Sequence, residues 1–269
     1  MKPNLNIILL TLIIGSINTA CSGNPANNRN KNNNPVETRS RKVIFEDNFN
    51  QTTQIPDTTK WSLCTHYIGD PFISGSYDQA YVKDGKLILK GEKVKGVYKT
   101  GGIWTKNKFD FTYGKVEVSA KFISAQGSWP AIWLMPYEPN IYEKAEGEID
   151  IMEQVNRESI VYQTLHTYYI TTLKQISPMR QISAHYNVNE FNTYAVEWTP
   201  DNIIFSVNGK VTLTYPNLHL AHEKQMRQWP YNKPFYLIMN IYLGGSWPGE
   251  IRDNELPVSM EVDWVKVSQ

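Results

Sequence analysis

The amino-acid sequence predicts an all-β domain, a sandwich or barrel of antiparallel strands. Apolar residues recur with a period of two from Val43 onward, as they do in strands that bury one face. Turn-forming dipeptides separate these runs, and no window longer than ten residues has a convincing helical period of 3.6. With 269 residues and a hydrophobic share of 41%, the chain can bury one sizeable core, and we expect a single domain over residues 43–269.

Individual strands can be assigned in chain order. Residues 81–89 alternate around the tight-turn dipeptide Asp84-Gly85, and residues 114–122 alternate cleanly as one half-buried strand. Residues 203–207 and 210–213 flank Asn208-Gly209, which predicts a hairpin with a type I′ turn. Further strands are expected at residues 161–169, 235–242 and 258–267.

The N-terminus has the pattern of a targeting segment. Lys2 precedes a nearly continuous apolar stretch over residues 5–17, the length of a signal-peptide core and short for a membrane span. Thr19-Ala20-Cys21 then resembles the bacterial lipobox, although Asn18 stands where an aliphatic residue is usual. We expect residues 1–20 to be a lipoprotein signal peptide and Cys21 to be lipidated. The alternative is an ordinary cleaved signal followed by an incidental cysteine.

Residues 21–42 are rich in Asn, Pro and charge, which predicts a flexible tether. These features predict secretion across the inner membrane and an outer-membrane lipoprotein that faces the periplasm or the exterior. The membrane contact would be through the lipid anchor only. A lipidated Cys21 would leave Cys64 as a free, buried thiol. The net charge of +1 gives no reason to expect nucleic-acid binding, and we expect a monomer.

Three acids lie close together in the segment 147–153, GEIDIME. In a strand Glu148 and Asp150 point to one face, whereas Glu153 would fall on the other. A β-bulge of one extra residue would bring Glu153 back to the face of the other two. Such a cluster of like charges is costly in stability, so it indicates a function, although an exposed acidic strand or a calcium site built from carboxylates is an alternative.

Paired carboxyls of this kind suit glycoside hydrolysis. Retaining glycosidases use two carboxyls about 5–5.5 Å apart, one ionised to attack the sugar and one protonated to release the leaving group. A third acid between them can share a proton and raise the pKa of the acid.

Several motifs together resemble glycoside hydrolase family 16, in its laminarinase-like branch. The segment 148–153 matches that family's E-x-D-x-x-E signature. Similar segments follow the family's order along the chain: residues 101–105 (GGIWT), 111–117 (FTYGKVE), 129–136 (WPAIWLMP), 194–200 (YAVEWTP), 244–249 (GGSWPG) and 260–267 (MEVDWVKV). The resemblance covers about residues 43–269.

The resemblance implies a β-jelly roll, of the concanavalin A-like kind, whose concave sheet carries the substrate cleft. Glu148 would be the nucleophile, Glu153 the general acid/base and Asp150 an assisting residue. No cofactor would be required and no catalytic metal is expected, while a structural Ca²⁺ is compatible with the family analogy. Candidate substrate-binding residues are Trp129, Trp133, His166, Asn240, Tyr242, Trp247 and Trp104, with Trp229 as a further cleft candidate; core packing is the alternative for the tryptophans, and a structural role for His166.

The resemblance leaves the polysaccharide open. It implies a retaining endo-β-glycosidase that cuts β-1,3-glucan or mixed-linkage β-1,3/1,4-glucan. Gly102, however, stands where arginine is common in the laminarinase pattern. The alternative is an endo-β-1,4-galactosidase acting on mucin-type O-glycans or keratan-like chains. A non-catalytic glycan-binding surface lipoprotein is the alternative of another class, since one sandwich can serve several functions.

Overall fold

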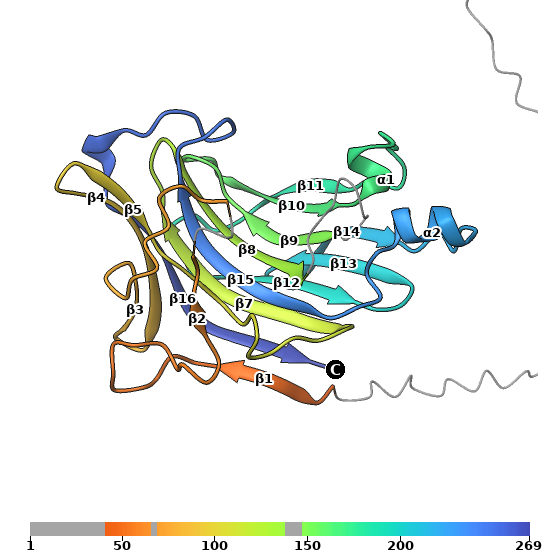
Figure 1. Ribbon diagram of the computed structural model, residues 1–269, viewed down its shortest axis with the longest axis horizontal. Helices are drawn as coiled ribbons and strands as arrows, with labels where there is room; N and C mark the ends of the chain where they lie inside the picture. The colour runs from red at the N-terminus through yellow and green to blue at the C-terminus, as the bar shows by residue number, and fades with distance from the viewer. Residues whose placement is uncertain (1–40, 66–68, 138–146) are drawn as a thin grey trace, which may run out of the picture. The chain divides into compact units, whose positions relative to one another are not determined.

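Two antiparallel β-sheets pack face to face in a computed structural model, which describes residues 41–65, 69–137 and 147–269 (Figure 1). These residues belong to one compact unit, Ser40–Gln269. The predicted signal peptide, Cys21 and nearly all of the tether lie outside the described residues. The all-β prediction is confirmed.

The first sheet has nine strands. Its path runs β14 (Lys210–Pro216), β13 (Asn202–Val207), β12 (Asn192–Trp198), β7 (Gly114–Ile123), β16 (Val258–Ser268), β4 (Lys86–Val94), β3 (Ala80–Lys83), while β1 (Val43–Asp47) pairs with β16 and β5 (Val97–Thr100) with β4. The second sheet has seven strands in the order β11 (Gln181–His185), β10 (Ile160–His166), β9 (Glu148–Glu153), β8 (Ser128–Pro136), β15 (Phe235–Leu243), β6 (Gly102–Trp104), β2 (Ser62–Leu63).

The core lies between the sheets and follows from alternation along each strand. Leu87 and Leu89 of β4 point into it from the first sheet, and Ile132 and Leu134 of β8 from the second. Burying these side chains is the main stabilising contribution, at about 1.5–3 kcal/mol for each large one. The opposite face of the seven-stranded sheet therefore stays available for a binding site.

Both predicted tight turns are confirmed. Asp84 and Gly85 have φ angles of 52° and 70°, and Asn208 and Gly209 have 51° and 76°. Two successive residues in the left-handed region define the type I′ turn, whose twist matches that of the flanking strands.

The strand predicted at residues 161–169 was wrong at its C-terminal end. Strand β10 ends at His166, and the short helix α1 covers Tyr168–Thr171. Thr167 explains the change, because its side-chain oxygen accepts a hydrogen bond from the amide of Ile170 and caps the helix.

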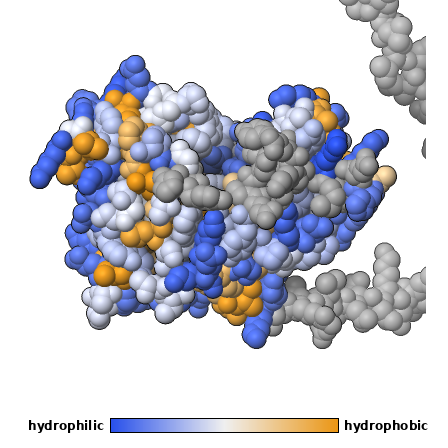
Figure 2. Space-filling view, in the orientation of Figure 1, coloured by the Kyte–Doolittle hydropathy of each residue, from blue (hydrophilic) through white to orange (hydrophobic). Residues whose placement is uncertain are grey.

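Among the residues that the structure describes, the other helical elements are α2 (His222–Gln228) and a 3₁₀ turn at Asp253–Glu255. Helices α1 and α2 lie beside each other at one end of the sandwich (Figure 1). Within the described residues, none of these helices is long and apolar enough to cross a bilayer. The face shown in Figure 2 is mostly hydrophilic, with scattered hydrophobic side chains.

Candidate active site

A β-bulge in β9 places all three acids on the face of the sheet that points away from the core. Trp133 of β8 lies opposite Asp150. The preceding residue of β8, Ile132, lies opposite Met152, which leaves Ile151 as the extra residue. Ile151 and Met152 are both fully buried in the core. The predicted bulge is confirmed, and it returns Glu153 to the face of Glu148 and Asp150.

Two of the three acids, Glu153 and Asp150, have a side-chain neighbour that orients them. The indole Nε1 of Trp129 donates to Oε1 of Glu153 over 3.1 Å. His166 lies opposite Glu148 in the β9–β10 register, and its Nε2 is 3.1 Å from Oδ2 of Asp150. Asp150 and Glu153 are buried, whereas Glu148 is half-buried. The outer two acids are thus separated by a third that is paired with a histidine.

Burial and mutual repulsion raise the affinity of both glutamates for protons. Burial, then the charge of Asp150, raises the pKa of Glu148 from 4.5 to about 8. The same two causes, together with the charge of Glu148, raise the pKa of Glu153 well above 4.5, against the hydrogen bond from Trp129. Burial alone would lower the pKa of His166, but the Asp150 carboxylate and the charge of Glu148 raise it overall. The cluster of Glu148, Glu153 and His166 therefore retains bound protons near neutral pH.

The two glutamates open into one cleft of about 440 Å³. Its lining comprises Trp129, Glu148, Glu153, Tyr162, Thr164, His166, Arg180, Gln181 and Trp247. Five of these residues were predicted from the sequence as catalytic or substrate-binding. A cleft of this kind lets a long chain lie across the sheet while both carboxyls reach one bond.

Aromatic side chains form one wall of the cleft beside Glu153. Trp129 stacks on Tyr242 with ring centroids 4.9 Å apart. Trp247 meets the edges of Trp129 and Tyr162, at 5.1 Å in both cases. Trp247 keeps 40% of its surface exposed, so it presents a free ring surface on which a sugar can stack.

Other predicted binding residues lie on the same sheet face but are covered. The indole of Trp133 donates to Oδ1 of Asn240 over 2.8 Å, and both residues are buried. Trp104 is buried against Tyr236 and lies, with the free and buried Cys64, in a small apolar cluster on this face. Neither Trp104, Trp133 nor Asn240 lines the cleft.

Trp229 was wrongly suggested as a cleft residue. It is 3% exposed in the main core, where its ring stacks on Tyr215 at 6.1 Å. The residue follows directly on α2 and turns inward, which composition alone does not reveal.

Four cleft residues were missed from the sequence. Tyr162 and Thr164 precede His166 at intervals of two on β10, so alternation from His166 could have identified them. Arg180 and Gln181 reach the cleft because β11 pairs with β10, with Gln181 opposite Thr164. No local signal in the sequence predicts that pairing.

One group in the described residues has the side-chain types and closeness of a metal site. Single ligand atoms of Glu148, Asp150 and His166 all lie within 4.8 Å of one another. A divalent cation held there would neutralise the negative charge of the Glu148 carboxylate. Attack on a sugar needs that charge. The group thus suits proton sharing between acids and histidine better than a resident metal.

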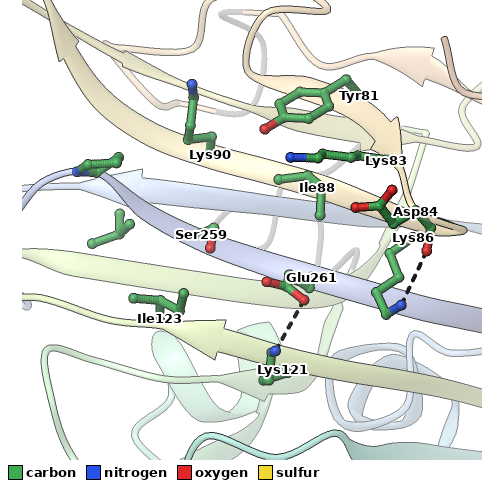
Figure 3. Close-up of a pocket in the computed structure, with 12 residues that line it drawn as sticks. Tyr81, Lys83, Asp84, Lys86, Ile88, Lys90, Lys121, Ile123, Ser259 and Glu261 are labelled. Carbon is green, nitrogen blue, oxygen red and sulfur yellow. Dashed lines mark hydrogen bonds and ion pairs between the residues drawn. The ribbon is translucent and has the colours of Figure 1, made fainter. Parts of the chain in front are cut away.

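A second groove, of about 510 Å³, lies on the outer face of the nine-stranded sheet (Figure 3). It is rich in lysine, but Lys121 is paired with Glu261 at 3.2 Å, and Lys90 with Glu92 at 3.0 Å. Its two acids, Asp84 in the turn between β3 and β4 and Glu261 on β16, come from different elements, unlike the acids of β9. The catalytic chemistry belongs to the cleft on the other sheet.

The pKa shifts predict a pH profile. If Glu148 acts ionised and Glu153 acts protonated, kcat/KM rises as pH passes the pKa of Glu148 and falls as pH passes the pKa of Glu153. Both pKa values are raised above 4.5, so we expect a bell-shaped profile that is shifted to high pH, with its acidic limb centred near pH 8. Initial rates at buffered pH values test this, and a rate that stays flat from pH 4 to 9 would contradict it.

The same shift predicts a gain in stability when Glu148 is replaced by glutamine. A carboxyl whose folded-state pKa is raised stabilises the fold below pH 4.5 and loses that contribution as pH rises to about 8. Glutamine remains neutral throughout, so Glu148→Gln should be more stable at pH 8 by roughly 2–4 kcal/mol, or about 4–16 °C in Tm, where the upper end is the full pKa shift; little difference is expected at pH 4.5. Thermal unfolding at the two pH values measures this. The exposed Glu250→Gln serves as control, and equal Tm changes for both variants would refute the explanation.

A two-sheet β-sandwich whose outer face presents paired glutamates beside the half-buried Trp129 and the exposed Trp247 defines a carbohydrate-active protein of the glycoside hydrolase class. The chain belongs to glycosyl hydrolases family 16, whose model matches residues 71–266.

The similar proteins include enzymes named for keratan sulfate and for β-glucan. A keratan-sulfate endo-1,4-beta-galactosidase from Sphingobacterium multivorum is 37% identical over 86% of this chain, which spans 56% of that protein's length. A beta-glucanase from Rhodothermus marinus is 32% identical, with 84% of each protein covered. A solved structure from work on endo-acting O-glycanases that initiate mucin breakdown by human gut bacteria is 35% identical, with a TM-score of 0.73 over 84% of this chain and 99% of that one.

Proposed function

We propose that the protein is a retaining endo-β-glycosidase that uses Glu148 as nucleophile, Glu153 as general acid/base and Asp150 as an assisting group. The observation that carries the proposal is the bulge at Ile151, which turns Glu148 and Glu153 into the same cleft. Family 16 membership supports it independently.

The geometry suits a double displacement. Glu148 attacks the anomeric carbon while Glu153 gives its proton to the departing glycosidic oxygen, which leaves a covalent glycosyl-enzyme. Glu153, now ionised, removes a proton from a water molecule that attacks the anomeric carbon and releases Glu148. Asp150, held by His166, stabilises the proton arrangement between the two glutamates. Two inversions return the β configuration.

Proton NMR of the first product tests the mechanism. The new reducing end should appear as the β anomer before mutarotation, and an initial α anomer would exclude a retaining reaction. A reducing-end assay distinguishes the enzyme from a glycan-binding protein. Sugar binding without release of reducing ends by the wild type would establish the non-catalytic alternative.

For the substrate we propose a galactose-containing glycan, in preference to the β-glucan that the sequence put first. A Cβ at Gly102 would lie 2.8 Å from Cβ of Asn240 and 3.1 Å from Sγ of Cys64. An arginine, common here in the laminarinase pattern, therefore has no room without moving its neighbours. The identities of 37% and 35% to proteins named for keratan and mucin glycans support the same choice.

β-Glucan remains the second candidate, because the beta-glucanase relative is matched over 84% of both chains. Product analysis after incubation with laminarin, barley glucan, keratan and mucin O-glycans separates the two. Oligosaccharides from keratan or mucin alone would support the galactosidase, and products from the glucans alone would support the second candidate.

We further propose that the enzyme works as a monomer without a cofactor, tethered to the outer membrane through a lipid on Cys21. A small-residue pair before Cys21 and a polar tether after it support the anchor. In a host that processes lipoproteins, Cys21→Ala should move the protein from the membrane to the soluble fraction with its activity kept. Unchanged fractionation would contradict the anchor.

A further inference from the structure

Another cavity, separate from the groove of Figure 3, continues the catalytic cleft along α1 and the start of β11. It has a volume of about 600 Å³ and shares His166, Arg180 and Gln181 with the cleft. The segment between α1 and β11 supplies most of the remaining wall, including Lys174 and Ile176. A chain bound across Glu148 and Glu153 that extends past His166 enters this cavity.

The residues that line the cavity include two cations and no acid, although Arg180 also lines the neighbouring cleft with Glu148 and Glu153. The two cations are Lys174 and Arg180. In the part of the chain that the structure describes, neither side chain takes part in an ion pair or a hydrogen bond, and Arg180 is half-buried. The charge of Arg180 also acts on His166, which places its guanidinium beside the catalytic centre. Elsewhere lysines and arginines near the sheets commonly meet acids, such as Lys115 with Glu117 at 2.6 Å.

Apolar groups accompany the two cations. Ile176 is 91% exposed and Met179 54%, and both line the cavity. Hydrophobic surface is visible beside α1 in Figure 2. A ligand that fits must therefore combine an apolar surface with an anionic group, as a sugar ring that carries a sulfate or a carboxylate does.

We propose that this cavity is a subsite for an anionic substituent on the glycan, and that Arg180 and Lys174 bind this substituent. The proposal rests on the glycosidase function proposed above. The substituent is either a sulfate ester or a sugar carboxylate. Its recognition sets substrate preference and takes no part in bond cleavage.

The test compares the ratio of kcat/KM on charged and uncharged forms of one substrate. One arm uses keratan sulfate and chemically desulfated keratan, and the other uses sialylated mucin O-glycans before and after sialidase treatment. A wild-type preference for keratan sulfate over desulfated keratan identifies a sulfate ester as the bound group. A preference for the sialylated over the sialidase-treated O-glycans identifies a sugar carboxylate. The variants are Arg180→Gln and Lys174→Asn; asparagine suits position 174 because its φ of 54° is left-handed. Arg180 adjoins His166 and can influence all substrates, and the ratio removes that effect.

We expect the double variant to lower the ratio by about tenfold or more, since charge-assisted hydrogen bonds to the anion are lost. The wild-type ratio should also fall as NaCl rises from about 0.05 to 0.5 M. Lys83→Asn is the matched control: it removes an exposed lysine from the distant groove of Figure 3, and its ratio should stay at the wild-type value.

An unchanged ratio in the double variant, or an equal fall in Lys83→Asn, would overturn the subsite. Failure of the proposed function looks different, because the wild type would then cleave neither form. In that case, titration calorimetry of the same sulfated and desulfated oligosaccharides, with and without Arg180→Gln and Lys174→Asn, still decides the proposal. Equal dissociation constants for the two forms on the wild type would refute it.

Discussion

Replacing Glu153 by alanine should lower kcat on the natural polysaccharide by about 10²–10⁴-fold. The loss arises because the glycosidic oxygen then departs without a proton and water attacks without a base. Glu153 is buried and receives a hydrogen bond from Trp129, and the other acid of β9 that lines the cleft, Glu148, is the proposed nucleophile. Initial rates of reducing-end release measure the effect.

An activated aryl β-glycoside separates this role from a structural one. Its leaving group needs no proton, so the first step survives in Glu153→Ala and the glycosyl-enzyme accumulates. Azide, which attacks without base catalysis, should then restore turnover and give a β-glycosyl azide. Glu250→Ala, at an exposed position outside the cleft, should retain full activity and show no azide effect. Full activity in Glu153→Ala on the natural chain would show that another group is the acid.

Sequence reasoning found the elements whose signal is local. The alternation over residues 114–122 predicts β7 because burial of every second side chain leaves that pattern, and Asn208-Gly209 predicts its turn because few other pairs accept two left-handed residues. The order of the strands carries no such signal. Asn240 of β15 pairs with Gly102 of β6 on one side and Ala131 of β8 on the other, and these contacts depend on packing of the whole sheet.

The residues of the active site also divide into those with a local sequence signal and those without one. Glu148, Asp150 and the bulge were predictable because three acids in one strand conflict with stability unless a function requires them. Part of the surroundings of these acids was not predictable, since Arg180 and Gln181 reach the cleft only through the pairing of β11 with β10, whereas Trp247 was a sequence candidate and does line the cleft. For Trp104 and Trp133 residue type and position near a motif left core packing open as the alternative, and only the structure shows that Trp104 packs on Tyr236 and that Trp133 donates to Asn240.

Replacing Glu148 should have the larger effect and leave a different product. With the nucleophile absent no glycosyl-enzyme forms, so Glu148→Ala should lose at least about 10⁴-fold in kcat on every substrate, including activated aryl glycosides. Azide can then attack the anomeric carbon only from the face that Glu148 occupied, and an activated β-glycoside should give an α-glycosyl azide. The two variants thus differ in the stereochemistry of one product, which NMR of the isolated azide records. A β-azide from Glu148→Ala together with an α-azide from Glu153→Ala would reverse the two roles, while the bulge in β9 would still account for how both carboxyls reach one sugar bond.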